Sequence, residues 1–182
     1  MFRQLLPLLA FVCALSFPFK NSFAQPLEPV KWEASVEEQE GENEYLLQFK
    51  ATIDENWKVY SIVPSGDDMG PIPTSINFED SSEVVFELSG EPKELGRKVE
   101  GYEAVFEMDL AYFKKKMILR HPIKLKQSGT VKGYIEYMAC DDVQCIFPDP
   151  FEFEFKMKAD GDESGDEDGG MLQPVKWDFK SG

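Results

Sequence analysis

The chain has 182 residues, of which 42% are hydrophobic and 13% aromatic, which is enough apolar side chain for one ordinary core but not for two. Its formal net charge is -15, from 34 acidic and 19 basic residues. Nucleic acids and anionic membrane surfaces would repel such a protein at long range, so we expect neither as a partner.

Residues 1–24 have the order of a secretory signal. Arg3 supplies the positive charge, residues 5–19 are mostly apolar, and the small residue Ala24 precedes Gln25. The apolar run would span only about 20 Å as a helix, against about 30 Å of hydrocarbon in a bilayer. We therefore expect an exported protein that is cleaved after Ala24, with a retained membrane anchor as the alternative.

Side-chain patterns of period two dominate residues 26–158. Phe151, Phe153, Phe155 and Met157 show the pattern best, because they fall on one face of an extended chain while charged residues fall on the other. Runs that suit half-buried strands cover residues 44–53, 74–79, 83–89, 104–113, 117–126, 129–139 and 151–157. No segment keeps an apolar period of 3.6 over three turns, so we expect little helix.

Turn signals rich in Gly, Pro, Asn and Asp separate these runs, for example at residues 65–68 and 70–73. Seven or more short strands with such punctuation predict an all-β domain, an immunoglobulin-like antiparallel β-sandwich. We place this domain at residues 25–158. Residues 159–182 include the stretch "DGDESGDEDGG", which cannot bury enough apolar surface to fold. We expect them to form an acidic flexible linker or tail.

Two cysteines, Cys140 and Cys145, lie between two of the predicted strands in the stretch "YIEYMACDDVQCIFPDPFEFEF". In an exported chain such a pair forms a structural disulfide or a redox centre. A disulfide needs Cα atoms about 4.4 to 6.8 Å apart, so residues 141–144 must form a turn. Closing so small a loop stabilises a fold by only about 2 kcal/mol, so the pair is poorly placed for a disulfide whose role is to stabilise the fold.

Three interpretations of the pair stay open at this point: a redox centre, a structural disulfide in a non-catalytic binding module, and a metal site. Asp141 and Asp142 would favour neutral thiols over thiolates, which suits a donor of electrons to other disulfides. A metal site has the least support, because tetrahedral sites usually need four Cys or His ligands and His121 is the sole histidine. Met108 and Met138 could join the thiolates around copper(I), although apolar strand positions also explain both.

The segments "GPIPTSINFE", "DLAYFKKKMILRHPIKLK" and "VKGYIEYMACDDVQCIFPDPFEFEFK" together resemble the periplasmic N-terminal domain of the thiol:disulfide interchange protein DsbD. The resemblance covers residues 29–158, and its most specific element is Tyr-x-x-Cys-x4-Cys-x-x-Pro, from Tyr137 to Pro148. It implies an immunoglobulin-like sandwich in the periplasm that carries a reversible disulfide and uses no cofactor. We expect a monomer.

In that family the cysteine pair receives electrons from a membrane-embedded and thioredoxin-like part of the same system. The pair then reduces disulfides in periplasmic proteins of the thioredoxin fold. By this resemblance, Cys145 would form the mixed disulfide with a partner and Cys140 would resolve it.

Family members also shield the pair with a loop that carries an aromatic residue over the sulfurs. The matching segment here is "EGYEAVFEMDLAY", in which Phe106 is the first choice for the shielding residue and Tyr102 the second. The resemblance makes Glu103 and Tyr137 further neighbours of the site. The alternative for Phe106 is an ordinary core position on a strand.

Overall fold

The computed structural model describes residues 27–66 and 69–161. These residues form eleven strands and one short 3-10 helix, η1 (Asp80–Ser82), which confirms the all-β prediction. None of them forms a helix with the length and apolar character needed to cross a bilayer. The predicted signal sequence and nearly all of the predicted acidic tail lie outside the described residues, and the domain boundaries stay predictions.

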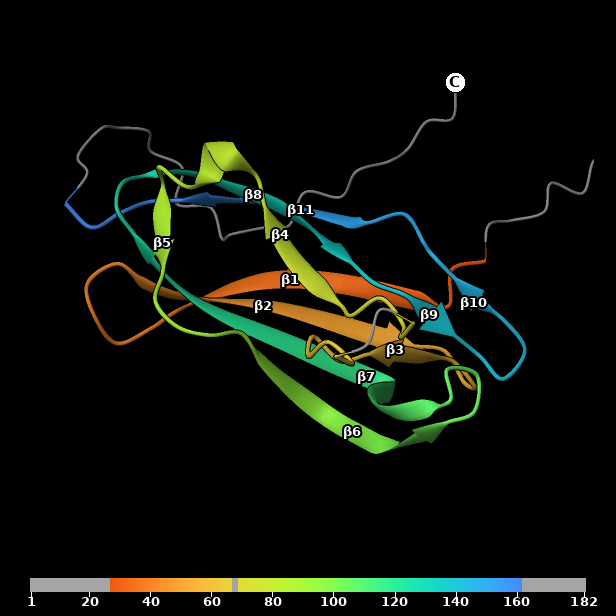
Figure 1. Cartoon of the computed structure of the whole chain (residues 1–182). Coiled ribbons are helices and arrows are strands. Elements are labelled where there is room, and N and C mark those ends of the chain that lie inside the picture. Colours follow the sequence, from red (N-terminus) through yellow and green to blue (C-terminus); the bar gives the residue numbers. More distant parts are fainter. Residues whose placement is uncertain (1–26, 67–68, 162–182) are drawn as a thin grey trace, which may run out of the picture.

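The strands form two antiparallel sheets that lie over one another (Figure 1). The larger sheet has eight strands in the order β1-β2-β7-β3-β9-β10, with β5 and β6 also paired to β7, and the smaller has the order β11-β8-β4. The immunoglobulin-like sandwich is thus confirmed. In chain order the strands are β1 (Val30–Glu38), β2 (Glu44–Ile53), β3 (Lys58–Tyr60), β4 (Ser75–Phe78), β5 (Phe86–Leu88), β6 (Lys93–Glu103), β7 (Met108–Leu125), β8 (Gly129–Glu136), β9 (Ala139–Cys140), β10 (Cys145–Ile146) and β11 (Phe151–Met157).

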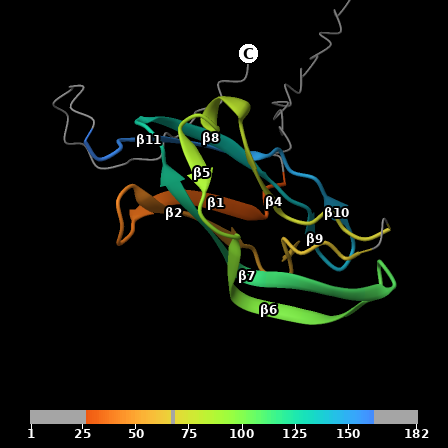
Figure 2. The same ribbon diagram turned by 60° about the vertical axis from the view of Figure 1, so that its left-hand side comes forward.

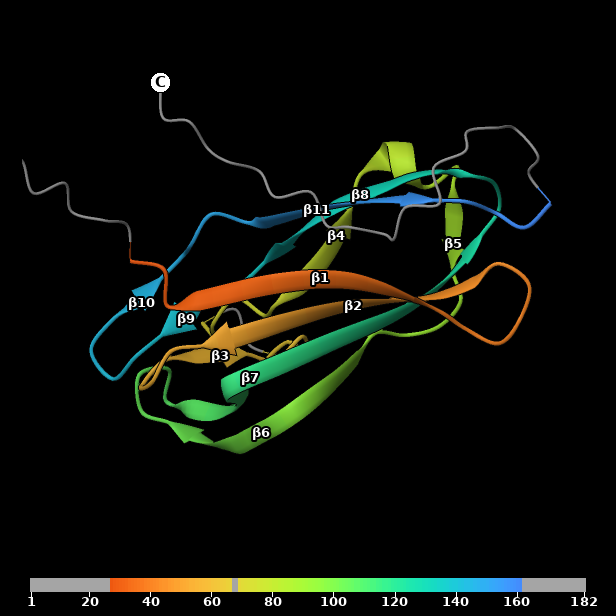
Figure 3. The ribbon, with the colours of Figure 1, turned by 180° about the vertical axis from the view of Figure 1, so that it is seen from behind.

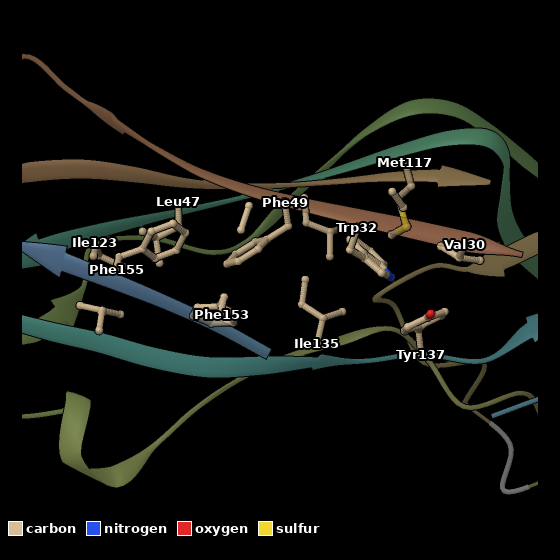
Figure 4. Packing of buried hydrophobic residues seen from close by; sticks show 14 of the residues in the cluster. Val30, Trp32, Leu47, Phe49, Met117, Ile123, Ile135, Tyr137, Phe153 and Phe155 are labelled. Carbon is tan, nitrogen blue, oxygen red and sulfur yellow. The ribbon is translucent and has the colours of Figure 1, made fainter. Parts of the chain in front are cut away.

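Aromatic and aliphatic side chains fill the main core between the two sheets (Figure 4). Phe49 of β2 faces Phe153 and Phe155 of β11, with ring centroids 4.7 and 6.3 Å apart. The face predicted for residues 151–157 is therefore the buried one. Burying each such ring contributes about 1.5 to 3 kcal/mol to the free energy of unfolding, so this contact joins the two sheets firmly.

The long strand β7 differs from the expectation of two separate strands at residues 104–113 and 117–126. It runs unbroken from Met108 to Leu125, and residues 104–107 form the turn that joins it to β6. The exposed run Lys114–Lys116 interrupts the alternation without ending the strand, because it lies opposite a bulge of β6 between Gly96 and Lys98. The β6–β7 hairpin lies at the side of the sandwich away from the smaller sheet (Figure 2).

Gly133 lies on β8 where the strands of the smaller sheet approach each other closely. A Cβ at this position would overlap the carbonyl oxygen of Asn77 and lie 2.6 Å from the ring of Phe153. Since neither the paired backbone nor the buried ring can move freely, we expect Gly133→Ala to lower the free energy of unfolding by about 1 to 3 kcal/mol. Urea unfolding measures this as a lower midpoint.

The matched control is Gly101→Ala on β6, where a Cβ would meet nothing within 4 Å. We expect that substitution to change the free energy of unfolding by less than about 0.5 kcal/mol. Equal midpoints for the two variants would contradict the close approach of β8 to β4.

Candidate functional site

A disulfide joins Cys140 of β9 to Cys145 of β10, with the two Cα atoms 4.1 Å apart. The residues face each other directly in a short hairpin, so the predicted turn between them is present. The Asp141 N–H donates to the carbonyl oxygen of Gln144 over 2.9 Å, and Asp141 Oδ1 accepts the N–H groups of Val143 and Gln144 at 2.8 and 2.7 Å. Asp141 thus stabilises the turn that brings the sulfurs together.

Alternate residues leading to the disulfide point to opposite faces of the larger sheet. Tyr137 and Ala139 lie in the main core, whereas Met138 and Cys140 belong to a second buried cluster. Figure 4 shows Tyr137 facing Trp32 in the main core, and their ring centroids are 5.5 Å apart. The disulfide therefore lies on the outer face of the larger sheet, with the main core behind it.

The outer-face cluster has a buried centre and a partly exposed edge. Cys140 in its centre is only 1% exposed, whereas Cys145 at its edge is half-buried. Cys145 is therefore the cysteine that another molecule can reach more easily. We define the cluster as Tyr60, Leu110, Met138 and Cys140, with Phe106, Met108, Tyr112 and Cys145 packed against them.

The turn between β6 and β7, which we call the cap turn (residues 103–107), covers part of this cluster. The Phe106 N–H donates to the Glu103 carbonyl oxygen over 3.2 Å, and the Phe106 ring meets Tyr60 edge-on at 5.7 Å between centroids. Figures 1 and 3 place this end of the hairpin beside β9 and β10. The structure thus places Phe106 in the same cluster as the cysteines, while Tyr102 lies outside the cluster with 66% of its surface exposed.

A buried ion pair connects the cap turn to β3. Lys58 Nζ lies 2.5 Å from Glu103 Oε2, and the two side chains are only 7% and 11% exposed. Lys58 is also the strand partner of Cys140, and its Nζ lies 5.2 Å from the centre of the Tyr112 ring. The family resemblance predicts Glu103 as a neighbour of the site but does not point to Lys58, whose one signal in the sequence is a charged residue inside the apolar run of residues 57–60.

The two methionines considered as copper(I) ligands lie in the same cluster. Met138 is one of its buried members, and Met108 packs against it. His121 lies elsewhere, on β7 beside Phe78, and burial lowers the pKa of its imidazole. Over residues 27–66 and 69–161, no group of three or more His, Cys, Asp or Glu residues could hold a metal ion.

A cavity of about 320 Å³ adjoins the outer-face cluster and shares Tyr60 and Leu110 with it. Prolines of the segment after β3 and charged residues of the β6–β7 hairpin, among them Lys98 and Asp109, form other parts of its wall. The cavity therefore lies next to the outer-face cluster, although neither cysteine lines it.

A family model described as "Thiol:disulfide interchange protein DsbD, N-terminal" matches residues 24–156. The chain belongs to this family. The match includes both cysteines, the cap turn and Lys58. It confirms the resemblance to the DsbD N-terminal domain that the cysteine motif carried.

Two solved structures are similar to this DsbD-type domain. The N-terminal periplasmic domain of ScsB from Proteus mirabilis is 14% identical with a TM-score of 0.54, over 75% of this chain and 50% of that one. The chain thus spans about half the length of that structure. The reduced N-terminal domain of Neisseria meningitidis DsbD is 15% identical with a TM-score of 0.39, over 66% and 81% of the two chains. No curated protein sequence matches the chain.

Two buried tyrosines beside the cysteines have strongly raised pKa values, mainly because burial disfavours the phenolate. For Tyr60 the negative charge of Glu103 raises the pKa further, and its hydroxyl has no hydrogen-bond partner among the described residues. For Tyr137 burial raises the pKa to about 12. Both phenols therefore stay neutral well above pH 7.

This raised pKa makes the free energy of unfolding sensitive to alkaline pH. Unfolded tyrosine loses its proton near pH 10, whereas folded Tyr137 keeps its proton up to about 12, so the folded state binds more protons between these values. The free energy of unfolding should fall there by up to about 1.4 kcal/mol per pH unit for this residue, and Tyr137→Phe should remove that share. Urea unfolding between about pH 10 and 12 measures the slope, and equal slopes in both proteins would contradict the expected effect of Tyr137.

Proposed function

We propose that this domain relays electrons through a reversible Cys140–Cys145 disulfide to thioredoxin-fold partner proteins in the periplasm. A membrane-embedded donor restores the dithiol after each transfer. The observation that carries the proposal is the unequal burial of the pair, with Cys140 enclosed in the outer-face cluster and Cys145 at its edge. Membership of the DsbD N-terminal family supports thiol:disulfide interchange as the chemistry.

The exchange proceeds in two substitutions at sulfur. The Cys145 thiolate attacks one sulfur of the partner's disulfide, which forms a mixed disulfide and releases the partner's first thiolate. The Cys140 thiolate then attacks the Cys145 sulfur, which closes the intramolecular disulfide and releases the second partner thiolate. Each released thiolate takes up a proton at neutral pH, and two electrons pass to the partner. The donor reverses these steps.

The position of the pair favours reversible chemistry over a structural role. The disulfide closes a loop with a sequence separation of five residues, which stabilises the fold by only about 2 kcal/mol. It lies outside the aromatic contacts that join the two sheets. Breaking it therefore leaves the main core intact.

The neighbouring residues have distinct roles in this proposal. Phe106 shields the sulfurs from small thiols, and Glu103 anchors the turn that carries it. Tyr137 fixes the entry to β9 by packing against Trp32 in the main core. The exposed ring of Tyr102 is available to a docked partner. Export to the periplasm is supported by the signal-like residues 1–24 and by the periplasmic origin of the ScsB domain.

Single-cysteine variants test the assignment of the two sulfurs. Cys140→Ser should accumulate a mixed disulfide with a periplasmic thioredoxin-fold protein, because nothing remains to resolve it. Cys145→Ser should trap none, since its remaining thiol is the buried one. Non-reducing electrophoresis with mass spectrometry measures the adduct, and the double variant is the control. Equal trapping by both single variants, or by neither, would contradict the assignment.

The reduction potential separates this function from the alternative of a binding module with a structural disulfide. Exchange proteins have potentials of about -120 to -270 mV, whereas structural disulfides fall below about -300 mV. We expect the Cys140–Cys145 pair to lie in the first range, measured by equilibration of the domain in graded thiol buffers with mass readout. A value in the second range would favour the structural alternative.

A further inference from the structure

The Lys58–Glu103 ion pair differs from the other ion pairs of the described residues in its burial. Both of its side chains are nearly inaccessible, whereas every other pair includes a side chain that is 34% exposed or more. Removing two charges from water is costly, and a pair of well-packed apolar residues often stabilises a fold as well or better. Stability alone is therefore a poor explanation for a lysine and a glutamate at these positions.

The ion pair joins two parts of the site, the strand β3 and the cap turn. Lys58 is on β3, directly opposite Cys140 of β9, so its backbone is fixed to the strand that carries the buried cysteine. Glu103 is the last residue of β6 and begins the cap turn. Its carbonyl oxygen accepts the N–H of Phe106, so the ion pair and the shielding ring are attached to the same residue.

Among residues 27–66 and 69–161, neither charge makes a second ion pair. Lys58 Nζ has the Tyr112 ring on one side at 5.2 Å, and the Tyr60 hydroxyl makes no hydrogen bond within the described ranges. If the cap turn moved away from the sheet, Lys58 would lose the carboxylate that compensates its charge while β3 held it in place. Opening of the turn therefore carries an electrostatic penalty as well as the loss of apolar contacts.

We infer that Lys58 and Glu103 are positioning residues that form a latch, which holds the cap turn and Phe106 over the Cys140–Cys145 disulfide. The inference rests on the proposed exchange function and adds to it the means by which access to the sulfurs is limited. A partner that docks at this end must displace the turn against the latch, whereas a small thiol supplies no docking contacts to do so.

The test measures the second-order rate constant for reduction of the disulfide by dithiothreitol in the folded protein. Lys58→Met keeps most of the side-chain stem and removes the charge, and Glu103→Gln keeps the shape of the carboxylate. We expect each to speed reduction about tenfold, the change that corresponds to about 1.4 kcal/mol less resistance to opening. Hydrogen exchange at the Phe106 amide should also become faster, because its acceptor belongs to Glu103.

The direction in which the reduction rate changes distinguishes a latch from the direct effect of the Lys58 charge on the attacking thiolate. Dithiothreitol attacks as an anionic thiolate, so loss of the Lys58 cation would by itself slow the attack. Faster reduction of Lys58→Met is therefore expected from a latch and not from the direct effect of the lost charge on the attacking thiolate. The double variant should react no faster than the faster single variant, since both substitutions break one interaction, whereas independent effects would multiply to about a hundredfold.

Matched controls keep the latch separate from the stability of the fold and from the function itself. Lys50→Met breaks the exposed 2.6 Å ion pair between Lys50 of β2 and Glu33 of β1. It should leave the reduction rate unchanged. A Lys58→Met or Glu103→Gln protein with a lower urea midpoint but an unchanged reduction rate would overturn the latch. If Phe106→Ala speeds reduction and both latch variants do not, then Phe106 shields the disulfide but the Lys58–Glu103 pair does not hold Phe106 in place. Failure of the cysteine trapping would instead remove the exchange function.

Discussion

The alternation of side chains across a strand is the constraint on which this end of the molecule depends. Where β3 and β9 pair, both faces of the larger sheet are covered, so successive residues serve different clusters. Val59 and Ala139 complete the main core, while their neighbours Lys58 and Cys140 face the cap turn. A shift of one residue in this pairing would move the sulfur into the core and an alanine to the surface. The register of two short strands thus determines whether the disulfide is accessible.

The two buried clusters differ in how they are stabilised. The main core is a continuous set of aromatic and aliphatic contacts between sheets, in which many small contributions add. The outer-face cluster combines a disulfide, two thioethers and aromatic rings beside one enclosed ion pair. Because well-packed apolar residues often stabilise a fold as well as a buried ion pair does, the ion pair matters here mainly because it fixes Lys58 and Glu103 relative to each other.

Much of the fold could be predicted from the sequence where a strand has one face in the core and one in water. β2 matches its expected range of residues 44–53, and β11 matches residues 151–157. β3 could not be found this way, because both of its faces are buried and no alternation remains. The cysteine spacing predicted the turn before Cys145. Lys58 could not be recognised as part of the site, since its partner Glu103 is 45 residues away in the chain.

The fold depends little on the small loop that Cys140 and Cys145 close. Reduction of a five-residue connection releases little chain entropy, and the main core on the other face of the sheet is untouched. Under the proposed exchange, oxidised and reduced molecules would therefore share one fold, and repeated turnover would require no refolding. In the reduced form, the more exposed Cys145 would be the sulfur open to overoxidation to sulfinic acid, while the enclosed Cys140 would be protected.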